Sequence, residues 1–78
     1  MAVLRLFASA REAAGTGRDV VDGATVGAVL TEAGRRYGDA FTDALQACQV
    51  WCNGEPASVT DRVDDDDEVA VLPPVSGG

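Results

Sequence analysis

The chain has 78 residues, a formal net charge of −7 and a hydrophobic fraction of 46%. That length suits one small domain, and that hydrophobic fraction excludes a disordered chain. Because phosphate backbones and anionic lipids repel an acidic protein, the charge argues against nucleic acid and membranes as partners and favours a basic surface on another protein.

The N-terminal segment predicts a strand followed by a short helix. "AVLRLFA", residues 2–8, alternates in the manner of a strand with one buried face. Ser9 and Glu12 have the spacing of a capping box, in which each side chain satisfies a backbone N–H at the start of a helix. We expect that helix to run through Ala14 and to end at Gly15. The residues expected to face the core are Leu4, Leu6 and Ala8, with Val3, Arg5 and Phe7 on the opposite face.

The next segment predicts a second strand and the main helix. "RDVVDG", residues 18–23, follows the first strand so closely that we expect antiparallel pairing with it. "TVGAVLTEAGRRYG", residues 25–38, is apolar at helical spacing, with Thr25 as the N-cap and a glycine to close the end. Its two internal glycines suggest a close approach of the helix to the sheet. "DAFTDALQ", residues 39–46, predicts a second, shorter helical piece.

The C-terminal third predicts a hairpin and a last strand. Asn53 and Gly54 supply the positive φ angles of a type I′ turn. Cys52 alternates toward the core together with Cys48, whereas Trp51 alternates away from it. An acidic turn then leads into a strand from Glu68 to Leu72. This order of elements predicts an α+β fold of the ubiquitin-like β-grasp type, in which a small mixed sheet packs against one main helix.

Residues 73–78, "PPVSGG", predict an extended, flexible tail beyond a domain formed by residues 1–72. Pro73 and Pro74 donate no backbone hydrogen bond, so strand pairing ends there and the chain leaves in an extended form. The stem from Pro73 through Val75 and Ser76 to the two glycines reaches ~20 Å at about 3.3 Å per residue, long enough to enter the active site of another protein. Gly77 and Gly78 have no Cβ and can pass through a narrow slot.

The group that we expect to react is the carboxylate of Gly78. A carboxylate is a poor electrophile until it is activated, and adenylation would convert it into an acyl-adenylate. A sulfur nucleophile would then yield a C-terminal thiocarboxylate, whereas an amine would yield an amide-linked protein tag. Without the proline stem and the predicted fold, a terminal diglycine would be no more than a frayed end.

The remaining side chains suggest little chemistry of their own. The chain has no histidine, and we expect it to bind no metal and no cofactor. Residues 64–68 lack the ligand spacing of a calcium loop and predict a solvated turn that helps to steer the domain onto a basic partner. Cys48 and Cys52 lie about 13 Å apart on a strand, which favours buried hydrophobic roles. Trp51 and Phe7 are candidate interface residues, the alternative for Trp51 being cover by its own neighbours.

The sequence predicts a cytoplasmic protein. The only apolar run of "MAVLRLFASA" contains an arginine and is too short for a signal peptide. No stretch approaches the ~20 apolar residues of a membrane span.

Three segments together resemble the small subunit of molybdopterin synthase, the MoaD-type sulfur carriers: "VLRLFASAREAAG", "VWCNGEP" and "DDDDEVAVLPPVSGG". The resemblance implies that a ubiquitin-activating-like adenylyltransferase uses ATP to adenylate Gly78, which then becomes a thiocarboxylate. It further implies that the tail enters the large catalytic subunit, within an assembly of two small and two large subunits. There the sulfur would pass to cyclic pyranopterin monophosphate, so the chain would not be catalytic alone. The family often has a glycine at the position of Asp66.

Two alternatives remain open. A ubiquitin-like protein modifier would be joined to target lysines through Gly78, and a carrier in a sibling pathway would serve thiamin or cysteine synthesis. The "LFASARE" segment and the Pro-Pro stem favour molybdopterin synthesis over the thiamin pathway. A plain interaction domain would leave the tail without a role.

Overall fold

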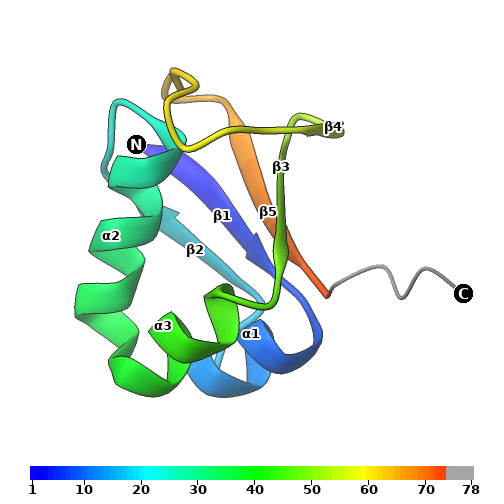
Figure 1. Ribbon diagram of the computed structural model, residues 1–78. Helices are drawn as coiled ribbons and strands as arrows, with labels where there is room; N and C mark the ends of the chain where they lie inside the picture. Colours follow the sequence, from blue (N-terminus) through cyan, green and yellow to red (C-terminus); the bar gives the residue numbers. More distant parts are fainter. Residues whose placement is uncertain (74–78) are drawn as a thin grey trace, which may run out of the picture.

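The computed structural model describes residues 1–73. Five strands form one mixed sheet in the order β2-β1-β5-β3-β4, and Figure 1 shows α1, α2 and α3 gathered on one side of it. β1 pairs antiparallel with β2 and parallel with β5, and β5 pairs antiparallel with β3. The predicted β-grasp fold is confirmed. The elements are β1 Ala2–Leu6, α1 Ala8–Ala14, β2 Arg18–Val21, α2 Val26–Tyr37, α3 Asp39–Leu45, β3 Gln49–Cys52, β4 Glu55–Pro56 and β5 Glu68–Leu72.

The core lies between the sheet and the helices. Phe41 of α3 is fully buried and meets the ring of Tyr37 edge to face, with the ring centroids 5.1 Å apart. It is surrounded by small aliphatic side chains. The buried residues are Ala2, Leu4, Leu6, Ala10, Val21, Val26, Val29, Ala33, Phe41, Val63, Val69 and Val71.

The start of α1 differs from the prediction. Phe7, not Ser9, is the N-cap residue, and no side chain caps the helix. The N–H of Phe7 still donates to the carbonyl of Val71 in β5, while its own carbonyl accepts from Arg11 in α1. The strand therefore passes into the helix without a loop, which leaves Ser9 inside the helix. Ala8 is consequently exposed in α1 and does not face the core.

The main helix agrees with the prediction at both ends. The Thr25 hydroxyl accepts a hydrogen bond from the Ala28 N–H at 3.1 Å, and Gly38, with φ 92°, ends the helix. The close approach of the two internal glycines is not to the sheet. A Cβ on Gly27 would lie 3.0 Å from the carbonyl oxygen of Val59, and one on Gly34 would meet the hydroxyl of Thr42 in α3. These glycines admit a surface loop and α3 against the helix.

The hairpin and the acidic turn are joined by side chains. Asn53 and Gly54 have φ angles of 52° and 84°, which confirms the left-handed turn. The Asn53 amide donates to Asp67 and accepts from the Glu68 N–H, both at 3.0 Å. Asp66 is not among the residues with positive φ, so the turn does not need the glycine that the family often has there.

Candidate functional site

The central strand, β5, leads to the candidate tail. Leu72, its last residue, lies opposite Gln49 of β3, and the preceding residue is hydrogen-bonded to Phe7 beyond the end of β1. Pro73 follows and is exposed. Because proline has no N–H, the ladder ends at this point. The exit from the domain is therefore held on both sides by strands. Five predicted site residues lie outside the described residues: Pro74, Val75, Ser76, Gly77 and Gly78.

The sheet face opposite the helices is the candidate docking face. We call it the outer face and define it by the outward residues of the four longer strands and by Phe7, which follows β1 and whose ring lies beside Arg5. Arg5, Ala70 and Trp51 form one row across β1, β5 and β3, because they are direct partners in the two ladders. Leu72 and Gln49 form the next row toward the tail. The outward residues are Arg18, Val20, Val3, Arg5, Glu68, Ala70, Leu72, Gln49 and Trp51.

The structure places both predicted interface residues on the outer face, on opposite sides of β5. Phe7 is 36% exposed, and the Arg5 guanidinium carbon lies 5.8 Å from the centre of its ring. Trp51 is half-buried, and its indole N–H donates to the Gln49 side chain at 3.2 Å. The short side chain of Ala70 lies between Arg5 and Trp51 and keeps the centre of the face flat. Two aromatic rings beside a flat centre, next to the exit of the chain, suit a protein partner.

Acidic residues border the outer face at the end away from the tail. Glu68 lies on it, 3.6 Å from Arg5, and the turn from Asp64 to Asp67 follows. The Asp67 carboxylate accepts hydrogen bonds from the Asp64 N–H and the Asn53 amide, which lower its pKa. The lowered pKa keeps Asp67 charged at neutral pH, and the acidic border favours a partner with a basic rim. Within residues 1–73, no three His, Cys, Asp or Glu side chains are grouped so as to hold a metal ion.

The two cysteines pack against the core as predicted. Both are free, half-buried thiols on the inner side of β3 and its approach. Burial raises the pKa of the Cys52 thiol, and nearby Asp67 and Asp61 add to the shift. A raised pKa lowers the thiolate fraction at neutral pH, so the Cys52 sulfur is not prepared for nucleophilic chemistry in the manner of a catalytic cysteine.

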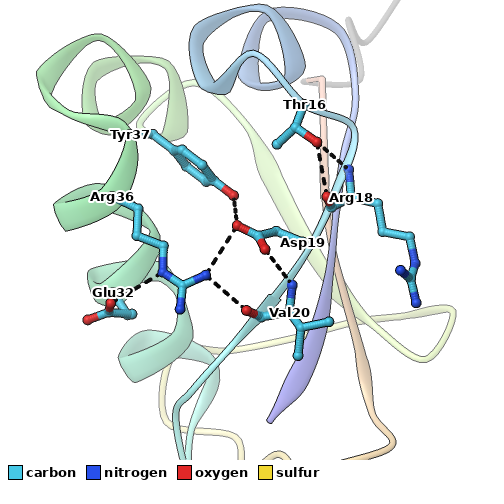
Figure 2. Close-up of polar contacts among 7 residues, drawn as sticks. All are labelled: Thr16, Arg18, Asp19, Val20, Glu32, Arg36 and Tyr37. Atoms are coloured by element: carbon cyan, nitrogen blue, oxygen red, sulfur yellow. Dashed lines mark hydrogen bonds and ion pairs between the residues drawn. The ribbon is translucent and has the colours of Figure 1, made fainter.

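A polar network between α2 and β2 was missed from the sequence. Tyr37 and Arg36 project from the last turn of α2 onto Asp19 of β2, and Glu32 holds Arg36 from the preceding turn (Figure 2). The contact to Asp19 joins residues 17 and 18 positions apart, and no local pattern indicates it.

Comparisons with known proteins agree with this geometry. The chain matches the model of the ThiS family over residues 4–78. Small archaeal modifier protein 1 from Haloferax volcanii is 34% identical, with 99% of this chain and 98% of that one covered and a TM-score of 0.80. The protein of the same name from Methanosarcina acetivorans is 28% identical, with 99% and 95% covered and a TM-score of 0.87.

A third similar structure is the putative molybdopterin converting factor, subunit 1, from Pyrococcus furiosus. It is 25% identical, with 95% of this chain and 97% of that one covered and a TM-score of 0.79. A search of curated proteins found no match. The chain therefore belongs to the ThiS family, and its β-grasp domain is that of the ubiquitin-like sulfur carriers and protein modifiers.

Proposed function

We propose that this chain is the sulfur carrier subunit of a molybdopterin synthase. The observation that carries the proposal is the course of β5, the central strand, which brings the chain out of the sheet at Pro73, between Phe7 and Gln49. The family match continues from the domain through this exit to residue 78. The domain binds the partner proteins, and Gly78, the sixth residue counted from Pro73, carries the reacting carboxylate.

The chemistry proceeds in two steps on an activating enzyme. A carboxylate oxygen of Gly78 attacks the α-phosphorus of ATP, and pyrophosphate leaves with formation of the acyl-adenylate. A sulfur nucleophile then attacks the acyl carbon, and AMP leaves. With hydrosulfide as the nucleophile, Gly78 then carries a thiocarboxylate. With a persulfide as the nucleophile, a second thiol attacks the donor sulfur, the S–S bond breaks, a disulfide forms on the donor and the thiocarboxylate stays on Gly78. ATP binds to the activating adenylyltransferase, so this chain itself needs no cofactor and is not catalytic alone.

The outer face serves the docking steps. A flat centre with Phe7 and Trp51 beside it offers apolar contact area to the adenylyltransferase and, in turn, to the large catalytic subunit. The acidic border steers the domain onto a basic rim on either partner. In the large subunit the thiocarboxylate donates sulfur to cyclic pyranopterin monophosphate. We expect the assembly to contain two copies of each subunit and to work in the cytoplasm.

Intact-mass spectrometry tests the proposal. Incubation with a cognate adenylyltransferase, ATP and a sulfur source should exchange one oxygen of Gly78 for sulfur, and addition of the large subunit and cyclic pyranopterin monophosphate should then yield molybdopterin. A chain lacking Gly78, and one extended by a single residue, should fold normally and transfer no sulfur. Molybdopterin formation by the extended chain would show that the proposal is wrong.

A second candidate function is protein modification. The 34% identity to small archaeal modifier protein 1 from Haloferax volcanii favours it. The acyl-adenylate would be the same, but a lysine amine of a target would displace AMP and form an amide bond. Higher-mass conjugates that depend on Gly78, detected by immunoblotting of cells that express a tagged chain, would support the modifier. Their absence, together with a thiocarboxylate, would support the carrier.

A further inference from the structure

β2 is an edge strand, and side chains cover the backbone N–H and C=O groups along its outer edge. In the β1–β2 ladder the Leu6 N–H donates to the Gly17 carbonyl at 2.9 Å. Hydrogen-bonded and non-hydrogen-bonded pairs alternate along an antiparallel ladder. Arg18 and Val20, which lie opposite Arg5 and Val3, therefore direct their N–H and C=O groups away from β1 and toward the open edge. An edge of this kind is a template for another strand.

Side chains occupy all four of these backbone groups (Figure 2). The Thr16 hydroxyl accepts from the Arg18 N–H at 3.4 Å and donates to the Arg18 carbonyl at 3.0 Å. The Asp19 carboxylate accepts from the Val20 N–H at 2.8 Å, and the Arg36 guanidinium donates to the Val20 carbonyl at 2.9 Å.

The two charged members of this cover are held in place by α2. The Tyr37 hydroxyl donates to Asp19, and Arg36 forms ion pairs with Asp19 at 3.2 Å and with Glu32 at 3.4 Å. The opposite edge of the described sheet is protected differently, because β4 has two residues and one of them is Pro56, which has no N–H. Each edge of the sheet thus has its own obstacle to strand addition.

We propose that Thr16, Asp19 and Arg36 form a side-chain cover that prevents β2 from pairing with β2 of a second copy of this chain. The β2–β2 interface that this cover blocks is self-complementary. In an antiparallel pair centred on Asp19, Arg18 of each copy lies opposite Val20 of the other, and each of these two pairs exchanges both backbone hydrogen bonds. Asp19 would then face its own copy, so its charge also opposes the pairing.

The test removes the cover and measures self-association. In the variant Thr16→Val/Asp19→Val/Arg36→Met every covering group is gone, while Arg18 and Val20 keep their backbone groups. We expect folded variant protein, checked by circular dichroism, to dimerise at least about tenfold more tightly than the wild type in sedimentation equilibrium. The milder variant Thr16→Val/Arg36→Met keeps the contact between Asp19 and Tyr37 and should show a smaller tightening. If the triple variant does not fold, the self-association of this milder variant tests the proposal.

The matched control is Thr42→Val/Asp43→Ala/Arg35→Met, which makes the same changes of charge on the helices and should self-associate like the wild type. Adding Val20→Pro to the triple variant should restore the monomer, because it removes an edge N–H that β1 does not use. Two results would overturn the proposal. One is a folded cover variant that is as monomeric as the wild type, and the other is dimerisation that survives Val20→Pro.

Discussion

Replacing Tyr37 by phenylalanine removes one hydroxyl from the contact between α2 and β2 and keeps the ring. The edge-to-face packing on Phe41 is retained. The Asp19 carboxylate loses one donor, and hydrogen bonds to charged groups contribute about 1.5–3 kcal/mol to stability. Because Tyr37 is only half-buried and Arg36 still holds Asp19, we expect the free energy of unfolding at pH 7 to fall by about 1.5 kcal/mol, at the low end of that range.

The cost of this substitution should depend on pH. Burial, followed by the hydrogen bond to Asp19, raises the pKa of Tyr37 from 10.0 to about 12. Between these values the unfolded chain releases the phenolic proton and the folded chain keeps it, so the wild type loses stability as the pH rises through this window. Two pKa units correspond to at most about 2.7 kcal/mol, and partial exposure reduces this to about 1–2 kcal/mol. Phenylalanine does not titrate, so the difference in the free energy of unfolding between the wild type and Tyr37→Phe should become smaller as the pH rises through this window.

At acidic pH the wild type loses stability as the pH falls, the opposite direction to its loss at alkaline pH. The hydrogen bond from Tyr37 is the largest cause of the lowered pKa of Asp19, with the Val20 N–H and Arg36 adding to it. The stability from this lowering is present above the pKa of an unfolded aspartate and is lost as the pH falls through the folded value. The wild type should therefore lose more stability in acid than Tyr37→Phe does.

Urea titrations followed by circular dichroism, repeated from about pH 3 to about pH 12, measure the loss of stability at pH 7 and its changes at alkaline and at acidic pH. The two proteins differ only at position 37, so the contributions of groups away from the contact cancel in the difference. Parallel stability curves on the alkaline side, or an unchanged free energy of unfolding at pH 7, would refute the reasoning.

Two further predictions concern docking and packing. Phe7→Ala and Trp51→Ala should each weaken binding to the adenylyltransferase about tenfold in calorimetry. The control Val59→Ala, which removes an exposed side chain beside α2, should leave this binding unchanged. An equal loss of affinity in all three variants would contradict docking through the outer face. Gly23→Ala should lower stability by about 1–3 kcal/mol in urea titrations, because its Cβ would lie 2.7 Å from a backbone nitrogen of α2. Gly17→Ala meets only the flexible Arg11 side chain, so an equal cost there would contradict this reasoning.

Most of the fold could be predicted because local signals agreed with tertiary demands. Thr25 and Gly38 at the ends of α2, and Asn53 with Gly54 in the hairpin, act through the backbone within a few residues. The start of α1 was predicted wrongly because Ser9 gave a local capping signal that a longer-range bond overruled. Phe7 remains paired with β5, some 64 positions later in the chain, and this pairing starts the helix early.

The candidate site was predictable only in part. Alternation along the strands placed Phe7 and Trp51 on the outer face, because side chains of a strand alternate between its two sides. The cover of β2 could not be predicted, since it depends on how α2 crosses the sheet and brings Arg36 and Tyr37 to Asp19. That crossing is set by the core as a whole and leaves no mark at a fixed spacing in the sequence.

The most direct test of the account is the mass of the C-terminal peptide after reaction with the adenylyltransferase, ATP and a sulfur source. The account predicts that sulfur replaces one oxygen at Gly78 and at no other position, and that the large subunit consumes this sulfur as molybdopterin forms. Sulfur found on Cys48 or Cys52, with an unchanged Gly78, would contradict it.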